Sequence, residues 1–161
     1  MKLLTARHGF TLIELMLSVA VVGILFSSGI SAYTKSQRSQ AVKSTAEKIL
    51  IILQSAQKKT IIGDKDCTGA LDNYEVKYVS GASSITTTAK CTSNSGSVVT
   101  DTLTNVSFVG NGTLNFRPLG AGVSFAGGGD SQNIDFRYGA ASTTYRLSIS
   151  KSGSISYLGE I

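Results

Sequence analysis

The chain begins with a long and almost uninterrupted run of apolar residues. Between Phe10 and Ala32 the only charged residue is Glu14. A helix of about 23 residues is roughly 35 Å long, which is enough to cross the apolar core of a bilayer, about 30 Å thick. The pattern therefore predicts a membrane-spanning helix over residues 10–33.

A second pattern follows the apolar run. Hydrophobic residues recur at spacings of three and four, as on one face of an amphipathic helix that packs against a core. No proline occurs before Pro118, so no proline interrupts such a helix. We expect one continuous helix of about 50 residues, from Phe10 to about Thr60, with its amphipathic half over residues 34–62. The hydrophobic stripe consists of Val42, Ala46, Ile49, Leu50, Leu53 and Ala56.

A third pattern begins after Gly63, where hydrophobic and polar residues alternate as they do in half-buried β-strands. Residues 150–153 have the composition of a tight turn between two strands. The predicted fold class is therefore α+β, with an antiparallel β-sheet head over residues 63–161 packed on the long N-terminal helix. The expected strands cover residues 74–78, 98–109, 113–116, 134–138 and 145–149, with Ile155 and Tyr157 on a return strand.

Two segments of the head share features with ligand-binding loops. Residues 120–132 are glycine-rich but lack the Gly-Lys-Ser/Thr ending of a phosphate-binding loop, so we expect a flexible surface loop there. Asp64 and Asp66 have the spacing that begins a calcium-binding loop, but no acidic ligand follows at a suitable distance. A turn after the helix is the favoured interpretation of that segment.

The charges are unevenly distributed. Basic residues outnumber acidic ones by 15 to 10. From Thr34 to Thr60 six basic residues stand against Glu47 alone, whereas from Ile61 onward seven basic residues meet eight acidic ones. The surplus therefore belongs to the helix, and the head is close to neutral. A solvated helix face explains this distribution better than nucleic-acid binding does.

Both cysteines, Cys67 and Cys91, follow the apolar segment. If that segment sends the head out of the cytoplasm, the two thiols meet an oxidising compartment and form a disulfide bond. Two free buried thiols are the alternative in a cytosolic protein. Two cysteines without a nearby histidine fall short of the four ligands usual in a zinc site, so we expect no metal and no cofactor.

Glu14 decides between three interpretations of the apolar segment. An ordinary secretory signal peptide has a shorter apolar stretch and a small-residue cleavage site, for which residues 27–32 offer a candidate. A plain membrane anchor explains the length, but an acid within it costs up to about 3 kcal/mol. The third interpretation is a membrane helix that carries a processing signal at its start.

The segment from Gly9 to Leu15, "GFTLIEL", follows a short basic leader and opens the apolar helix. This motif resembles the N-terminal signal of type IV pilins and type II secretion pseudopilins. The resemblance implies that residues 1–9 are a leader peptide, which a prepilin peptidase removes by cutting between Gly9 and Phe10. It also implies that Phe10 is then N-methylated and that the fold is pilin-like.

The resemblance gives Glu14 a partner. Cleavage after Gly9 creates an ammonium group on Phe10, four residues from Glu14 and on the same face of the helix. When two chains pack side by side, Glu14 of one subunit is expected to pair with the Phe10 amine of its neighbour. Ionisable residues within a membrane usually pair with another polar or charged group, and the Phe10 amine is the expected partner of Glu14.

The C-terminal part of the chain resembles, less specifically, the GspH/FimT-type minor pilins and pseudopilins. The resemblance lies in "LNFRPLGAGV" and "YRLSISKSGSISYL". Some members of that class bind DNA through arginines near the end of the chain, whereas residues 152–161 contain none. DNA is therefore a less favoured partner, for which Arg137, Arg146 and Lys151 are the remaining candidates.

These features predict a structural subunit and not an enzyme. The only histidine, His8, lies in the leader, so the mature chain has no imidazole for catalysis. The expected partners are the prepilin peptidase, other pilin subunits, the inner membrane and its assembly platform. We expect a single-pass protein of the bacterial cytoplasmic membrane, with its N-terminus in the cytoplasm, that is later built into a filament.

Several alternatives remain open at this stage. The filament is either an extracellular pilus or the periplasmic pseudopilus of a type II secretion system, and the subunit is either major or minor. A filament-tip module that binds DNA or a surface ligand is an alternative from another class. A secreted soluble protein with a mature N-terminus near Tyr33 is a further one.

Overall fold

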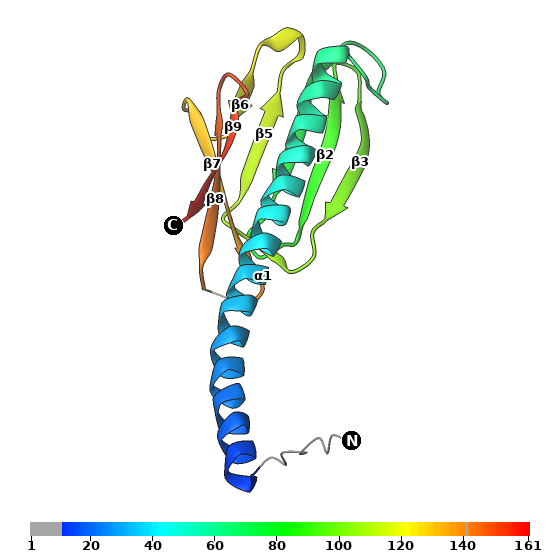
Figure 1. Ribbon diagram of the computed structural model, residues 1–161. Coiled ribbons are helices and arrows are strands. Elements are labelled where there is room, and N and C mark those ends of the chain that lie inside the picture. The colour runs from blue at the N-terminus through cyan, green and yellow to red at the C-terminus, as the bar shows by residue number, and fades with distance from the viewer. Residues whose placement is uncertain (1–10, 141) are drawn as a thin grey trace, which may run out of the picture. The chain divides into compact units, whose positions relative to one another are not determined.

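The computed structural model describes residues 11–140 and 142–161, without the side chains of residues 26–29, 31 and 32. Tertiary contacts divide the chain into two compact units, Met1–Ala41 and Val42–Ile161. The long helix α1 (Leu12–Ile62) runs through the boundary between them, and the second unit contains the strands (Figure 1). The other elements are β1 (Leu71–Tyr78), β2 (Ser84–Cys91), β3 (Ser95–Thr102), β4 (Val106–Val109), β5 (Gly112–Phe116), the 3-10 helix η1 (Pro118–Gly120), β6 (Val123–Phe125), β7 (Ser131–Tyr138), β8 (Thr144–Ser150) and β9 (Ile155–Glu160).

The helix α1 has 51 residues, which confirms the prediction of one continuous helix of about 50. Phe10, where that helix was expected to begin, lies outside the described residues. At the other end, Gly63 has a φ of 69°, a left-handed conformation that glycine adopts without strain. The backbone N–H of Asp64 donates to the carbonyl oxygen of Lys59 at 3.0 Å. This is the pairing of a Schellman motif, so the helix ends at Ile62 for a local reason.

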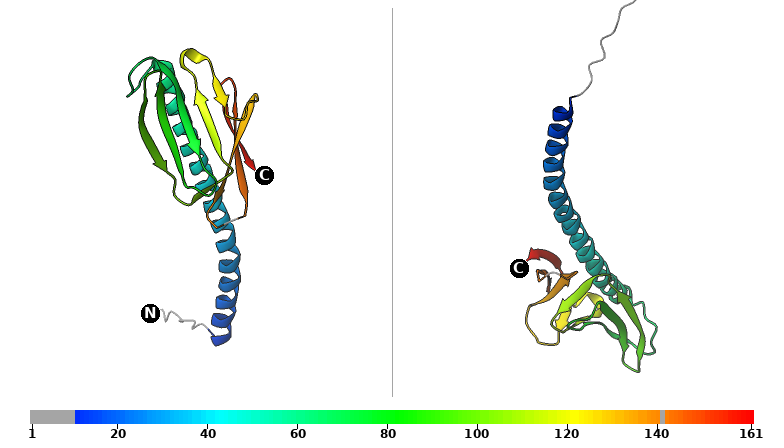
Figure 2. Two further views of the ribbon diagram at one scale, coloured as in Figure 1. Left: turned by 180° about the vertical axis from the view of Figure 1, so that it is seen from behind. Right: turned by 90° about the horizontal axis from the view of Figure 1, so that it is seen from below.

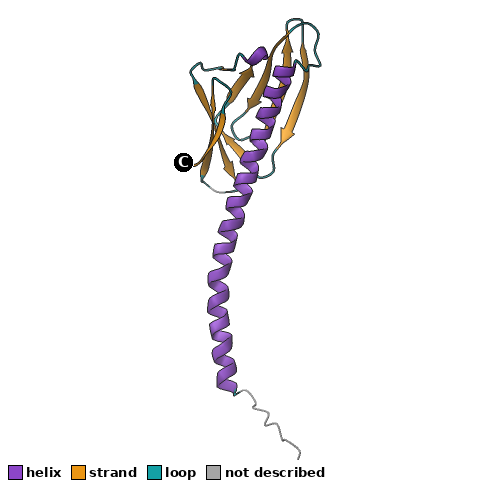
Figure 3. Cartoon of the chain, turned by 45° about the horizontal axis from the view of Figure 1, so that its top comes forward, coloured by secondary structure: helices purple, strands orange, loops and turns teal. Residues whose placement is uncertain are grey.

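The strands of the head form two antiparallel sheets. Sheet A has the order β3-β2-β1-β5-β6, and sheet B has the order β4-β7-β8-β9. Figure 3 shows the strands in orange. The α+β fold class is confirmed, with the helix packed on antiparallel sheets. The expected single strand over residues 98–109 is in fact two strands, β3 and β4, which belong to different sheets. Asn105, with a φ of 58°, lies in the turn between them.

The core of the second unit lies between α1 and the inner faces of the two sheets, and Figure 2 shows from behind that this part of α1 follows the far side of sheet A. The hydrophobic stripe of α1 is buried as predicted, except that Leu50 is only half-buried. Ile49 and Leu53 are fully buried, and the largest buried side chains from the sheets are Phe108, Phe116 and Phe136.

Tyr78 connects the two sheets. It lies on β1, and its hydroxyl donates to the carbonyl oxygen of Asn133 on β7 at 3.1 Å. The same hydroxyl accepts a hydrogen bond of 3.1 Å from the side chain of Gln132. Burial raises the pKa of Tyr78 above its ordinary value, because the charged phenolate would lose its hydration there.

Two strands were missed by the sequence analysis. β2 is rich in threonine and occupies a central place in sheet A, between β3 and β1. β6 lies within residues 120–132, which were expected to be a flexible surface loop. That expectation was wrong for its centre, because Val123 and Phe125 are 2% and 8% exposed and pack in the core. The predicted turn between β8 and β9 is confirmed, with Gly153 N–H donating to Ser150 O at 2.9 Å.

Candidate processing and assembly site

The start of α1 places Glu14 in the first turn of the helix, on an exposed position. The backbone N–H of Glu14 donates to the side-chain oxygen of Thr11 at 3.4 Å, and Leu15 N–H donates to Thr11 O at 3.1 Å. Thr11 is therefore the N-cap, and Thr11 and Glu14 have the spacing of a capping box. A carboxylate at this position is also stabilised by the positive end of the helix dipole. The structure thus shows an N-cap, from Thr11 to the backbone N–H of Glu14, that the sequence analysis missed, although "TLIE" has the spacing of a capping box.

Gly9 and Phe10 lie outside the described residues. The predicted cut, the methylated residue and the amine that would pair with Glu14 therefore stay predictions. What the structure does show is that the residues directly after them form the N-cap and first turn of α1.

The first unit presents many large apolar side chains on its surface. Ile13, Met16 and Ile24 are each at least 65% exposed. Exposed apolar surface of this extent is uncommon on a soluble monomer and marks an interaction surface. The exposed large hydrophobic residues of this unit are Leu12, Ile13, Leu15, Met16, Leu17, Val19, Val21, Val22, Ile24, Leu25, Ile30 and Tyr33.

In the part of the chain that the structure describes, no helix combines the length and the hydropathy needed to cross a membrane. The membrane pass over residues 10–33 stays a prediction.

A disulfide bond joins Cys67 to Cys91, as the sequence analysis favoured over two free thiols. The Cα atoms are 5.9 Å apart, and the bridge links the loop that follows α1 to the end of β2. The same loop is held at Asp66, whose carboxylate accepts hydrogen bonds from the backbone N–H of Ser97, at 2.8 Å, and from its hydroxyl. These bonds hold the pKa of Asp66 below its ordinary value. Asp66 therefore fastens the loop to β3.

Most cations of the head that the structure describes have anionic partners. Arg146 makes a bidentate pair with Asp135, with two nitrogen–oxygen distances of 2.7 Å. Lys151 lies 3.8 Å from Asp130. Of the three residues considered for DNA binding, only Arg137 has no carboxylate partner among the described residues; its Nε donates to Thr144 Oγ1 at 3.4 Å.

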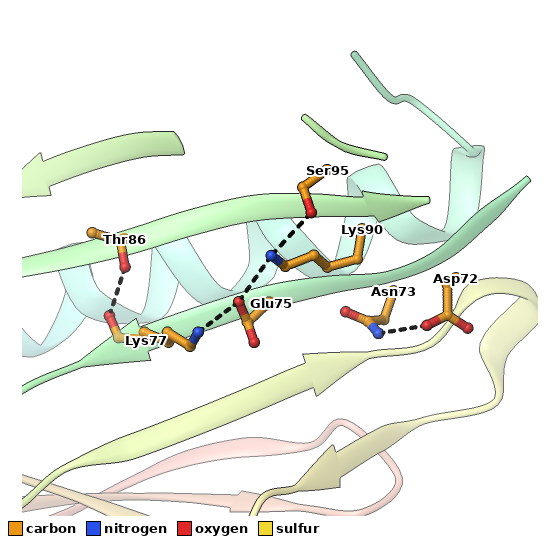
Figure 4. Close-up of polar contacts among 7 residues, drawn as sticks. All are labelled: Asp72, Asn73, Glu75, Lys77, Thr86, Lys90 and Ser95. Carbon is orange, nitrogen blue, oxygen red and sulfur yellow. Dashed lines mark hydrogen bonds and ion pairs between the residues drawn. The ribbon is translucent and has the colours of Figure 1, made fainter. Parts of the chain in front are cut away.

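Two lysines of sheet A, Lys77 and Lys90, also have an anionic partner (Figure 4). The carboxylate of Glu75 lies 2.9 Å from the ammonium group of Lys77 and 3.6 Å from that of Lys90. The amine of Lys90 also donates to Ser95 Oγ at 3.1 Å. The two ammonium groups therefore share one carboxylate.

A comparison with known protein families decides how the N-terminal segment is interpreted. Residues 4–30 match the family model described as the prokaryotic N-terminal methylation motif. The chain carries a prepilin-type signal. This signal supports a type IV pilin-like or pseudopilin precursor, and it implies processing by a peptidase and assembly with other pilin subunits. Comparison of the chain with curated proteins and with solved structures gave no match.

The prepilin-type signal contains Gly9, Phe10 and Glu14, the residues that the sequence analysis selected. The head contains a second feature that the sequence analysis missed. A cleft of about 340 Å³ lies between α1 and the inner faces of β2 and β3. It was missed because β2, which forms its floor, was not predicted.

Proposed function

We propose that this protein is a structural subunit, a major or minor pilin, of a type IV pilus or a related filament. The observation that carries the proposal is the methylation motif over residues 4–30, which includes the start of a helix with an exposed apolar surface. Other subunits of the same kind would cover that surface in a filament, because burial of apolar area favours association. A pseudopilin of a type II secretion system is the nearest alternative, since it would carry the same signal.

The proposed processing takes place at the start of the helix. A prepilin peptidase cuts between Gly9 and Phe10, and the new N-terminus of Phe10 is methylated. The protein is the substrate of these enzymes and is not itself proposed to catalyse a reaction or to need a cofactor.

Glu14 is the proposed assembly residue. Its position in the first turn of α1 is exposed, so its carboxylate is available to another chain. In a bundle of apolar helices, the amine of a neighbouring Phe10 would neutralise this carboxylate and set the axial register of the two chains. The helix is proposed to reside in the cytoplasmic membrane until the assembly platform adds the subunit to a pilus or pseudopilus.

Binding of DNA or of a surface ligand by the head is not favoured by the charges. Arg146, Lys77, Lys90 and Lys151 all lie near carboxylates, which reduces the positive potential that phosphate recognition needs. If the full-length protein retained DNA in a salt-sensitive manner, that result would support DNA binding by the head.

The proposal is tested by the intact mass and the N-terminal sequence of protein recovered from membranes and from sheared filaments. We expect a chain that begins at Phe10 and carries one added methyl group. A matched Gly9→Val variant should keep residues 1–9, because the residue at the cut is changed. Wild-type protein that retains residues 1–9 in cells with an active prepilin peptidase would overturn the proposal. A chain that begins near Tyr33 would show an ordinary signal peptide instead.

A further inference from the structure

The cleft between α1 and sheet A exists because sheet A is wider than the helix that covers it. α1 packs on the inner faces of β1 and β2, whereas the inner face of the edge strand β3 remains open. Ile51 of the helix and Val99 of β3 both line the cleft and are 61% and 48% exposed. Near the end of α1, the contact of Asp66 with Ser97 crosses from the loop to β3. The cleft therefore has apolar side chains in its lining, and a hydrogen bond between Ser97 and Asp66 joins the loop to β3 beside it.

The floor of this cleft contains a polar atom without a partner. Thr87 lines the cleft and is 9% exposed, and its hydroxyl oxygen makes no hydrogen bond among the described residues. Buried hydroxyl groups are nearly always hydrogen-bonded, because an unmade bond leaves the full cost of desolvation. A group that enters the cleft and hydrogen-bonds Thr87 would remove that cost.

The charges of the cleft favour a cationic occupant. The lining contains two carboxylates, Asp64 and Asp66, and two ammonium groups, Lys59 and Lys65, so the charges of these four residues sum to zero. Lys65 donates to the carbonyl oxygen of Gly69, and Lys59 interacts electrostatically with Asp66.

Asp101 is the remaining charged residue of the lining. Its carboxylate makes no ion pair or hydrogen bond within the described part of the chain. With Asp101 the lining has three carboxylates and two ammonium groups, which gives the cleft a net negative charge.

The strand register places the unbalanced carboxylate close to the unpaired hydroxyl. Thr87 lies opposite Val99, and Ile85 lies opposite Asp101. Asp101 and Thr87 are thus diagonal neighbours on the same face of the sheet, and such residues are about 7–8 Å apart, with their Cβ atoms somewhat closer. A guanidinium group has five donors in a planar fork and can bond both a carboxylate and a hydroxyl at this separation. Its aliphatic stem would lie between Ile51 and Val99.

We propose that the cleft binds the side chain of Arg38 from a second copy of this chain. Arg38 is the only arginine in the basic stretch from Thr34 to Thr60. It is exposed and makes no ion pair among the described residues. Residues 34–41, the part of this stretch that belongs to the first unit, carry Lys35 and Arg38 and no acidic residue, so their charge is complementary to that of the net negative cleft.

The proposed contact joins two different surfaces of the same chain. A contact of that kind is heterologous, and when the rotation does not close it produces an open helical filament. The inference rests on the proposed filament function and adds a head-to-helix contact to the pairing of Glu14.

The test uses charge reversal in full-length protein, expressed in the source organism without the wild-type copy. Asp101→Arg and Arg38→Asp should each reduce the amount of subunit in sheared filaments, relative to the membrane pool, by roughly tenfold. The double variant, with the two charges exchanged, should return to within about twofold of the wild type, because the ion pair is restored in reverse. Asp130→Arg is the matched control, since Asp130 is a 95% exposed carboxylate outside the cleft.

The variant Thr87→Val is a second test of the proposal, and it does not change the charge of the cleft. A purely structural role for Thr87 predicts that valine leaves incorporation unchanged and raises the thermal midpoint, because an unpaired buried hydroxyl is removed. The proposal predicts that the variant folds, forms its disulfide bond and still enters filaments several-fold less than the wild type.

The outcomes separate this inference from the filament function. If wild-type subunits assemble and Asp101→Arg assembles as well as Asp130→Arg, the inference is wrong and the filament function stands. If the double variant enters filaments as poorly as the single variants do, the proposed pairing of Asp101 with Arg38 is also wrong. If the wild-type protein is absent from filaments altogether, both the function and the inference fail.

Discussion

Two physical explanations are available for Glu14. The capping-box geometry with Thr11 stabilises the first turn of α1, and pairing with a neighbouring amine would set the register between subunits. The first involves the side chain of Thr11 and the backbone N–H of Glu14, whereas the second needs the negative charge of the Glu14 side chain. This difference makes the two explanations separable by experiment.

We expect Glu14→Ala and Glu14→Gln to be cut and retained in membranes but to enter filaments poorly. Glutamine keeps the hydrogen-bonding capacity of a capping box and loses the charge that the Phe10 amine requires. The measurement is the ratio of filament to membrane protein for each variant. Normal assembly of Glu14→Gln beside defective assembly of Glu14→Ala would assign Glu14 to capping alone.

Asp66 makes the stability of the head depend on acid. Its pKa is lowered in the folded state by the hydrogen bonds from Ser97. A lowered folded-state pKa contributes stability that is present above the unfolded value of 3.8 and is lost as the pH falls through the folded-state pKa. Thermal unfolding followed by circular dichroism should show a smaller decrease between pH 6 and pH 3 for Asp66→Asn than for the wild type. Equal decreases would show that other carboxylates cause the acid sensitivity.

At the scale of the element, α1 is stabilised in the head by a narrow buried stripe. Leu53 is fully buried, whereas Ile51, two residues earlier on the same helix, is 61% exposed. The difference follows from the helical period, which turns the two side chains to different faces. Both residues lie within the head, so one unfolding transition reports on both of them.

Leu53→Ala should lower the free energy of unfolding by about 2–5 kcal/mol, because it removes buried methyl groups and leaves a cavity. Ile51→Ala is the matched control and should change that free energy by less than about 0.5 kcal/mol. Urea unfolding of both variants, at constant slope, measures the two differences. If both variants lowered the free energy of unfolding by similar amounts, the buried stripe would not be the main contact of α1 with the core.

Elements differ in how far the sequence alone predicted them. The C-terminal end of α1 was predicted to within about two residues, because the helical periodicity and the change of pattern after Gly63 are local signals. β2 was missed because "SITTTAKC" has few apolar residues, and its threonines are buried by neighbouring strands on both sides. Strand propensity depends on such neighbours more than helix propensity does.

At the scale of the whole molecule, the disulfide bond stabilises the head by closing a long loop. Cys67 and Cys91 are 24 residues apart, so the chain-entropy model assigns the bond about 3 kcal/mol. The double variant Cys67→Ser/Cys91→Ser should unfold at a lower urea concentration by a corresponding amount. A reduced wild-type sample is the control, since it removes the same bond without a substitution. No change in either sample would contradict a stabilising role.

The sequence by itself determined the processing signal, the long helix and the alternation of the main strands. All three depend on residues close together in the chain, where spacing alone specifies the chemistry or the periodicity. The residues Gly9, Phe10 and Glu14 were selected from such a local motif, and the family comparison covers the same segment.

Only the tertiary structure decided the features that depend on distant partners. The division into two sheets, the anchoring of Asp66 by Ser97 and the pair of Arg146 with Asp135 each join separate segments. The cleft that holds Thr87 and Asp101 exists because β3 extends beyond the helix that covers its neighbours. Strand order and register fix these juxtapositions, and neither follows from the hydrophobic pattern of one segment.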